Sequence, residues 1–298
     1  RWRQAPFAQE QMHAGLNLPG LDELSPGGIE AGQVAEELKA LGPLPETGKA
    51  SVALVFDYQS YWTTMIQPQG KDFRYEELCF RWYEGLRRLG LDIDFVRPGA
   101  SLEGYALVVV PCMIEVDVAT ESALKRATGR ILVGARTGSR DRNFAIPKNL
   151  PPGPLGDSTG NRVIQAATLR PGLSDAVCGT VSGAGIRWRE YLQTSADILA
   201  RFANGDPALT ENGRMFYLAC WPDAALLADV LTLVAEKAGL QLFPVPDFIR
   251  IRRRGNLTFA FNYGTEDWVL PLEADIVLGN RTLKPQSVLA WKTGDRKP

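Results

Sequence analysis

Ala50-Ser-Val-Ala-Leu-Val-Phe-Asp57 is the stretch that decides the fold, because it is a short apolar, β-branched run that ends in an acidic residue. The turn-forming sequence Pro45-Glu-Thr-Gly48 precedes it, so the run is typical of a buried strand in a parallel sheet. Residues 92–96, 105–110 and 130–134 repeat the pattern, with helical patterns between the first pair and the last pair. Alternating strands and helices predict an α/β domain with right-handed crossovers and a sheet covered on both faces.

Ligands of such sheets bind at the carboxyl ends of the strands, which makes Asp57 and Tyr58 the first residues to consider. The pattern resembles flavodoxin-like and class I glutamine-amidotransferase-like domains. Cys112 follows the third strand, but a cysteine nucleophile there would need a nearby base. The turn after the fourth strand, Gly134-Ala-Arg-Thr-Gly138, contains no cysteine that could be a nucleophile. No GxGxxG or P-loop pattern follows a strand, so neither a flavin nor a nucleotide cofactor is expected. We interpret this domain as a scaffold.

Composition excludes several classes of function. The 298 residues include 33 basic and 34 acidic side chains, and the net charge of −1 gives no reason to expect nucleic acid or an anionic membrane as partner. We find neither an apolar run of the ~20 residues that a membrane span needs nor a signal-peptide pattern. The four cysteines are widely separated and show no zinc-site spacing, so we expect no metal in this chain and a reducing, cytoplasmic setting.

The chain contains a single histidine, His13, so every histidine-dependent mechanism would have to use it. Glu10 stands three residues earlier, and in a helix the two side chains would share one face. A carboxylate and an imidazole together accept and donate the hydrogen bonds that sugar hydroxyls make. The alternative interpretation is an ordinary surface turn with an exposed glutamate and a histidine packed on its neighbours.

Residues 1–41 have the pattern of one βα unit. A strand end at Trp2-Arg3-Gln4 and a loop precede an amphipathic helix over residues 29–41, whose apolar stripe is formed by Ile29, Val34, Leu38 and Leu41. One such unit does not close a domain, so we expect the chain to lack its natural beginning.

The rest of the chain divides into two further parts. Helical patterns cover residues 73–89, 120–126 and 223–239, and Thr120 is the expected cap of the second helix. Residues 186–220 have the alternation and the turn signals of antiparallel strands. Short strand patterns separated by glycine-containing turns fill the last 55 residues. The aromatic residues Tyr58, Tyr61 and Trp62 are interpreted as an interface or as a wall beside a neighbouring domain.

Several motifs in a consistent order resemble the C-terminal part of a bacterial β-galactosidase of glycoside hydrolase family forty-two. They are the segment 1–15, Val52-Ala-Leu-Val-Phe-Asp-Tyr-Gln-Ser-Tyr-Trp62, Gly134-Ala-Arg-Thr-Gly-Ser139, Leu150-Pro-Pro-Gly-Pro154 and Ile251-Arg-Arg-Arg-Gly-Asn256. The resemblance implies the last βα unit of a (β/α)₈ TIM barrel over residues 1–41, a flavodoxin- or amidotransferase-like α/β trimerisation domain over 42–242, and a small all-β, sandwich-like domain over 243–298.

The same resemblance implies the chemistry. The two catalytic glutamates of this retaining family, and the structural zinc of some members, belong to barrel segments upstream of Arg1, so no catalytic residue is expected in this chain. Glu10 and His13 match positions that hydrogen-bond galactose. We therefore expect this chain to be part of a β-galactosidase and to be inactive by itself. We also expect the full-length protein to be a homotrimer. Within the family the alternative is an α-L-arabinopyranosidase; outside it, the alternative is a non-catalytic oligomerisation or sugar-binding module.

Overall fold

The computed structural model of the chain describes residues 15–18, 22–68, 70 and 72–293. Two compact units are present. Residues 49–252 form the larger unit, and residues 1–48 together with 253–298 form the smaller one.

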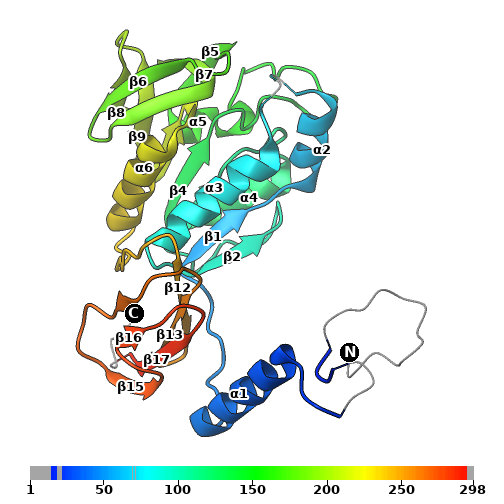
Figure 1. Cartoon of the computed structure of the whole chain (residues 1–298). Helices are drawn as coiled ribbons and strands as arrows, with labels where there is room; N and C mark the ends of the chain where they lie inside the picture. Colours follow the sequence, from blue (N-terminus) through cyan, green and yellow to red (C-terminus); the bar gives the residue numbers. More distant parts are fainter. Residues whose placement is uncertain (1–14, 19–21, 69, 71, 294–298) are drawn as a thin grey trace. The chain divides into compact units, whose positions relative to one another are not determined.

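A parallel sheet is the centre of the larger unit (Figure 1). Its strands run in the spatial order β2-β1-β3-β4-β10, and every neighbouring pair is parallel. Their bounds are β1 Val52–Val55, β2 Ile93–Val96, β3 Leu107–Val110, β4 Arg130–Gly134 and β10 Met215–Leu218. The four predicted strands are confirmed, each within one or two residues of its expected ends. β1 and β3 are buried along their whole length, as continuous apolar runs require.

Antiparallel strands extend this sheet on the side of β10. Within the described residues the sheet has eleven strands, ordered β11-β7-β6-β8-β9-β10-β4-β3-β1-β2 with β5 also paired to β7. The added strands are β5 Asn161–Thr168, β6 Ser174–Gly179, β7 Gly183–Thr194, β8 Asp197–Phe202, β9 Pro207–Asn212 and β11 Cys220–Pro222. The antiparallel character predicted for residues 186–220 is confirmed. β10 joins the two parts of the sheet, because it pairs antiparallel with β9 on one side and parallel with β4 on the other.

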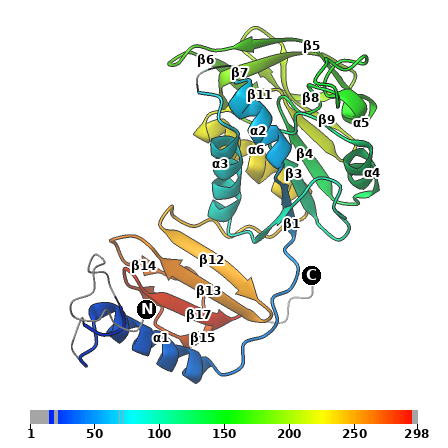
Figure 2. The same cartoon turned by 90° about the vertical axis from the view of Figure 1, so that its right-hand side faces the viewer.

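Helices cover both faces of the parallel strands, with α3 and α6 side by side on one face and α4 on the other (Figure 2). The helices of this unit are α2 Tyr58–Ile66, α3 Tyr75–Arg88, α4 Val118–Arg126, α5 Gly156–Thr159 and α6 Ala224–Lys237, with a 3₁₀ turn η1 at Gly153–Leu155. The predicted cap of α4 was wrong. Asp117 caps the helix by accepting a hydrogen bond from Thr120 N–H, and Thr120 itself lies in the first turn.

The helix predicted over residues 73–89 is confirmed as α3, whose inner face carries Trp82 and Leu86, both fully buried in the core. Burying a leucine or a similar apolar side chain stabilises the fold by about 1.5–3 kcal/mol. Acidic residues at the first turn and arginines at the last turn complement the helix dipole. The helix therefore anchors the sheet face on which it lies.

The smaller unit contains α1 Pro26–Leu41 and the strands of two small sheets, except that one strand, β12, begins within residues 49–252. β12 Ile249–Arg254, β13 Leu257–Asn262, β17 Val288–Lys292 and β15 Asp275–Leu278 form one sheet, and β14 Trp268–Val269 pairs with β16 Thr282–Leu283. The apolar stripe of α1, formed by Ile29, Val34 and Leu38, is 50–62% exposed in this chain. Ser25 caps the start of α1 by accepting a hydrogen bond from Gly28 N–H at 3.1 Å. Glycine at position 28 allows the close approach of residue 16, because a Cβ there would lie 2.0 Å from the Leu16 carbonyl oxygen.

Candidate functional site

Asp57, at the carboxyl end of β1, is a helix cap. Its carboxylate accepts hydrogen bonds from the N–H groups of Gln59, at 3.1 Å, and Ser60, at 3.0 Å, at the start of α2. Its own N–H donates to the Tyr75 hydroxyl at 2.7 Å. The carboxylate is thus committed to the backbone of α2, which supports the interpretation of this strand end as scaffold.

Cys112 lies beyond the end of β3 and is 1% exposed. Burial raises the pKa of its thiol to about 12, although the nearby guanidinium of Arg136 acts in the opposite direction. Since the thiolate is the nucleophile, a thiol with this pKa is inert at neutral pH. The burial of Cys112 fits the interpretation of this domain as a scaffold.

A buried carboxylate that was not predicted from the sequence lies on β7. Glu190 is 2% exposed and accepts hydrogen bonds from the Tyr217 hydroxyl at 2.6 Å, the Arg136 N–H at 2.8 Å and the Trp188 indole at 3.2 Å. Burial raises the pKa of this carboxyl group despite the three donors. The strand alternation was the available signal, because it places Glu190 on the same face as Trp188 and Leu192.

Arg136 completes this cluster at the end of β4. Its backbone is left-handed, with φ at 65°, and the side chain is 5% exposed. The guanidinium carbon lies 4.5 Å from the ring centre of Phe73 and 5.2 Å from that of Trp188. Buried side chains therefore fill the ends of β3 and β4, where a parallel sheet would otherwise bind its ligand.

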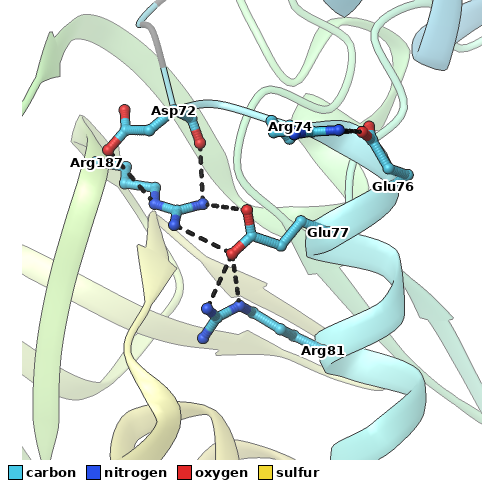
Figure 3. Close-up of polar contacts among 6 residues, drawn as sticks. All are labelled: Asp72, Arg74, Glu76, Glu77, Arg81 and Arg187. Atoms are coloured by element: carbon cyan, nitrogen blue, oxygen red, sulfur yellow. Dashed lines mark hydrogen bonds and ion pairs between the residues drawn. The ribbon is translucent and has the colours of Figure 1, made fainter.

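A network of charges joins β7 to the start of α3 (Figure 3). Arg187 donates to the carboxylate of Glu77 and to the backbone carbonyl of Asp72, the latter at 2.9 Å. Glu77 also accepts two hydrogen bonds from Arg81, one turn along α3. Figure 3 shows the guanidinium groups of Arg187 and Arg81 converging on the Glu77 carboxylate, while Arg74 and Glu76 form a separate pair. Every charge in the network is compensated within the chain, so its arrangement is that of a structural clamp.

The three aromatic residues predicted to form an interface or wall separate into two groups. Tyr58 and Trp62 are 62% and 58% exposed. Tyr61 points the other way and packs against the core, with its ring centre 6.3 Å from that of Tyr75. Only the first two are available to a partner.

Glu10 and His13, the predicted sugar-binding residues, lie outside the described residues. Among the residues that the structure describes, no group of three or more histidine, cysteine, aspartate or glutamate side chains could hold a metal ion. The same described ranges contain no helix that is long and apolar enough to cross a membrane.

Comparisons with known proteins give one consistent result. A family model described as the β-galactosidase trimerisation domain matches residues 50–241. A β-galactosidase of Thermus thermophilus is 44% identical over 295 residues, which cover 98% of this chain and 45% of the relative. A β-galactosidase of Haloferax lucentense is 32% identical, with 95% of this chain and 44% of the relative covered.

Solved structures agree. The β-galactosidase of the psychrophilic Marinomonas ef1 superposes with a TM-score of 0.92 at 38% identity, covering 98% of this chain and 46% of that one. The β-galactosidase of the Antarctic haloarchaeon Halorubrum lacusprofundi superposes with a TM-score of 0.89 at 29% identity, covering 98% of this chain and 46% of that one. The chain thus spans about half the length of the relatives it matches.

Proposed function

The chain belongs to the β-galactosidases of glycoside hydrolase family forty-two, and we propose that it is the C-terminal part of an enzyme that removes terminal, non-reducing β-D-galactose. The observation that carries the proposal is the extent of the similarity. At 44% identity, 98% of the chain aligns with one β-galactosidase.

The proposed reaction is hydrolysis with retention at the anomeric carbon. Retention requires one carboxylic acid to protonate the leaving oxygen and one carboxylate, ~5–5.5 Å away, to form a covalent glycosyl-enzyme that water then releases. We place both glutamates in the barrel part of the protein, upstream of Arg1. The three carboxylates described above, Asp57, Glu77 and Glu190, support this placement, because each is engaged by donors of the chain itself.

Glu10 and His13 are proposed to hold the galactose hydroxyls. A carboxylate accepts hydrogen bonds from two hydroxyls, and an imidazole both accepts and donates, so the pair can fix the ring against the reacting carboxylates. These residues are proposed to bind the substrate without making or breaking its bonds.

The domain division proposed from sequence fits this function. Residues 1–41 would be the last βα unit of the barrel, 42–242 the trimerisation domain and 243–298 the small β domain. The exposed stripe of α1 supports the first assignment, because Ile29, Val34 and Leu38 form the apolar face that a barrel helix buries against its neighbours. The protein is proposed to be a cytoplasmic homotrimer.

Activity assays on the protein made from the complete reading frame test the binding roles. Glu10→Gln and His13→Ala each remove hydrogen bonds to the sugar, so kcat/KM for nitrophenyl β-D-galactopyranoside should fall by about 10- to 150-fold, equivalent to ~1.5–3 kcal/mol. Glu30→Gln is the matched control, because Glu30 is exposed on α1. Unchanged kinetics in the first two variants would remove Glu10 and His13 from the site.

Competing substrates test the sugar that is recognised. An α-L-arabinopyranoside has the same ring configuration as the galactoside but lacks the hydroxymethyl group. If the pocket contacts that group, the galactoside should have the higher kcat/KM. A higher value for the arabinopyranoside would reassign the enzyme to the other specificity.

A further inference from the structure

The sequence contains two Asn-Gly pairs, Asn204-Gly205 and Asn212-Gly213. Each lies in a turn between antiparallel strands, the first between β8 and β9 and the second between β9 and β10. Asparagine is chemically labile, and a following glycine makes its side-chain amide open to attack by the next backbone nitrogen, because glycine has no Cβ to hinder the approach. Both pairs are exposed to solvent, but their hydrogen bonds differ.

The Asn204-Gly205 pair is held on both sides of the attack. Gly205 N–H, the group that would become the nucleophile, donates to the Phe202 carbonyl at 2.8 Å. The Asn204 side chain accepts from Arg189 Nη2 at 2.9 Å and from Asp206 N–H at 3.2 Å, and it donates to the Asp206 carboxylate at 2.7 Å. Attack on this amide therefore requires the nucleophile and the side chain to be released together.

The Asn212-Gly213 pair leaves the nucleophile free. Among the residues that the structure describes, no acceptor is bonded to Gly213 N–H. The glycine has φ at 59°, and a Cβ built on it would meet no atom within 4 Å. The turn borders a pocket of about 300 Å³, whose lining includes Ser158 and Arg214. Water and hydroxide can therefore reach this peptide nitrogen.

The Asn212 amide is restrained by α5 alone. Its Nδ2 donates to the backbone carbonyls of Ser158, at 3.0 Å, and Asp157, at 3.3 Å. No donor within the described ranges holds its Oδ1. Since α5 is a single turn of four residues, it adds little helical stability of its own. The pocket gives the amide room to turn from α5 toward the nitrogen of Gly213.

We propose that Asn212 is a site of spontaneous deamidation and that the fold protects Asn204. Hydroxide removes the proton of Gly213 N–H, and the nitrogen forms a bond to Asn212 Cγ. The bond from Cγ to Nδ2 breaks, and the amide nitrogen leaves as ammonia after taking a proton from water. Water then opens the five-membered imide. Cleavage between the Gly213 nitrogen and Cγ yields aspartate, whereas cleavage between that nitrogen and the backbone carbonyl carbon yields isoaspartate.

Both products weaken the join between β9 and α5. A carboxylate at position 212 has no N–H to donate, so the carbonyls of Ser158 and Asp157 lose their bonds and face a negative charge. Isoaspartate also adds a backbone atom beside the pair of Asn212 and Met215, which disturbs the strand register at the start of β10. Because β10 joins the parallel and antiparallel parts of the sheet, deamidation should lower the stability of the larger unit.

Peptide mapping by mass spectrometry tests the site. The complete protein is incubated at mildly alkaline pH, and the gain of one mass unit is followed in the peptides that carry the two pairs. We expect Asn212 to convert at least about fivefold faster than Asn204 in the folded protein, since breaking one hydrogen bond alone slows attack roughly 2- to 10-fold. Equal rates in the folded protein, or faster conversion of Asn204, would overturn the proposal.

The same measurement in urea separates the fold from the local sequence. Unfolding removes the hydrogen bonds of both turns, so the two rates should approach each other. A rate ratio that persists unchanged in urea would overturn the proposal, because the sequence around each pair and not the structure would then set the rates.

Asn212→Gln tests the consequence for stability. Glutamine keeps an amide donor but would have to form a larger ring, so it deamidates much more slowly. We expect the midpoint of thermal unfolding to fall during incubation in the wild type and in the control Asn204→Gln, and to stay constant in Asn212→Gln. A decline of the same size in Asn212→Gln would overturn the assignment of this loss to Asn212.

Discussion

The guanidinium of Arg187 and the carboxylate of Glu77 meet through two hydrogen bonds, 2.8 Å from Nη1 to Oε2 and 3.1 Å from Nη2 to Oε1. The bonds join β7 to the first turn of α3, across 110 residues of sequence. Arg187 has a left-handed backbone with φ at 60°, and its guanidinium carbon lies 4.7 Å from the ring centre of Trp221. The antiparallel extension of the sheet is thereby fastened to the helix that covers its parallel part.

Glu77→Gln should weaken this fastening. The hydrogen bonds to Arg187 lower the pKa of the Glu77 carboxyl, so its contribution is present above the unfolded pKa of ~4.5 and is lost as the pH falls through the folded value. We expect the free energy of unfolding at pH 7 to fall by ~1 kcal/mol, after discounting for partial exposure, and the difference from wild type to shrink below pH 4. Urea denaturation of the variant and the wild type, at pH 7 and below pH 4, measures this difference in the free energy of unfolding.

Glu76→Gln is the control for that variant. Glu76 pairs with Arg74, whose side chain is 66% exposed, so solvent screens the interaction. No measurable loss is expected. Equal losses in the two variants would contradict a special role for the pair of Arg187 and Glu77.

Leu86→Ala should destabilise the larger unit by about 2–5 kcal/mol, because the leucine is fully buried between α3 and the sheet and the substitution leaves a cavity. Phe80→Ala on the same helix is the matched control, since Phe80 is 60% exposed, and its effect should stay within ~0.5 kcal/mol. Thermal and urea unfolding of the two variants give the comparison. A larger effect at Phe80 would show that the helix faces are assigned wrongly.

Glu190→Gln should change the pH dependence of stability. Burial raises the folded pKa of the Glu190 carboxyl above its unfolded value, so the unmutated protein binds the extra proton in the folded state. Its contribution is therefore fully present below the unfolded pKa and is lost as the pH rises through the folded pKa. The glutamine is always neutral, so the decline of stability with rising pH above ~4.5 should be shallower in the variant. Parallel pH slopes in the two proteins would contradict a raised pKa.

Thiol labelling should find one fast cysteine per chain. Cys79, Cys112 and Cys220 are buried, and burial raises the pKa of each thiol, whereas Cys178 is exposed. A chromogenic disulfide reagent at pH 8 should therefore react rapidly with Cys178 and reach all four thiols only in denaturant. Cys178→Ser should abolish the fast phase. A fast phase that persists in this variant would mean that the core around Cys112 opens readily.

The parallel sheet was predictable, because short continuous apolar runs such as residues 52–55 and 107–110 are typical of strands that are buried on both faces of a sheet. Helix α2 was missed, because the usual pattern of a buried apolar stripe is reversed there and Ser60, Thr63 and Thr64 face the core. Glu190 was missed for a related reason. Its burial depends on the donors Tyr217 and Arg136, which are distant in sequence and meet only in the folded chain.

The stripe of α1 shows the limit of an amphipathic pattern. Ile29, Val34 and Leu38 indicate that a helix has an apolar face, but the pattern does not reveal which segment covers it. The roles of Glu10 and His13 stay predictions, because they follow from resemblance and lie outside the described residues.

The most direct measurement is the hydrolysis of nitrophenyl β-D-galactopyranoside by the protein produced from the complete reading frame that encodes this chain, beside purified residues 1–298. We expect turnover by the complete protein, with β-galactose as the first product seen by proton NMR, and none by residues 1–298 alone. Absence of turnover in the complete protein, or turnover by residues 1–298 alone, would contradict the assignment of this chain as the non-catalytic C-terminal part of a β-galactosidase.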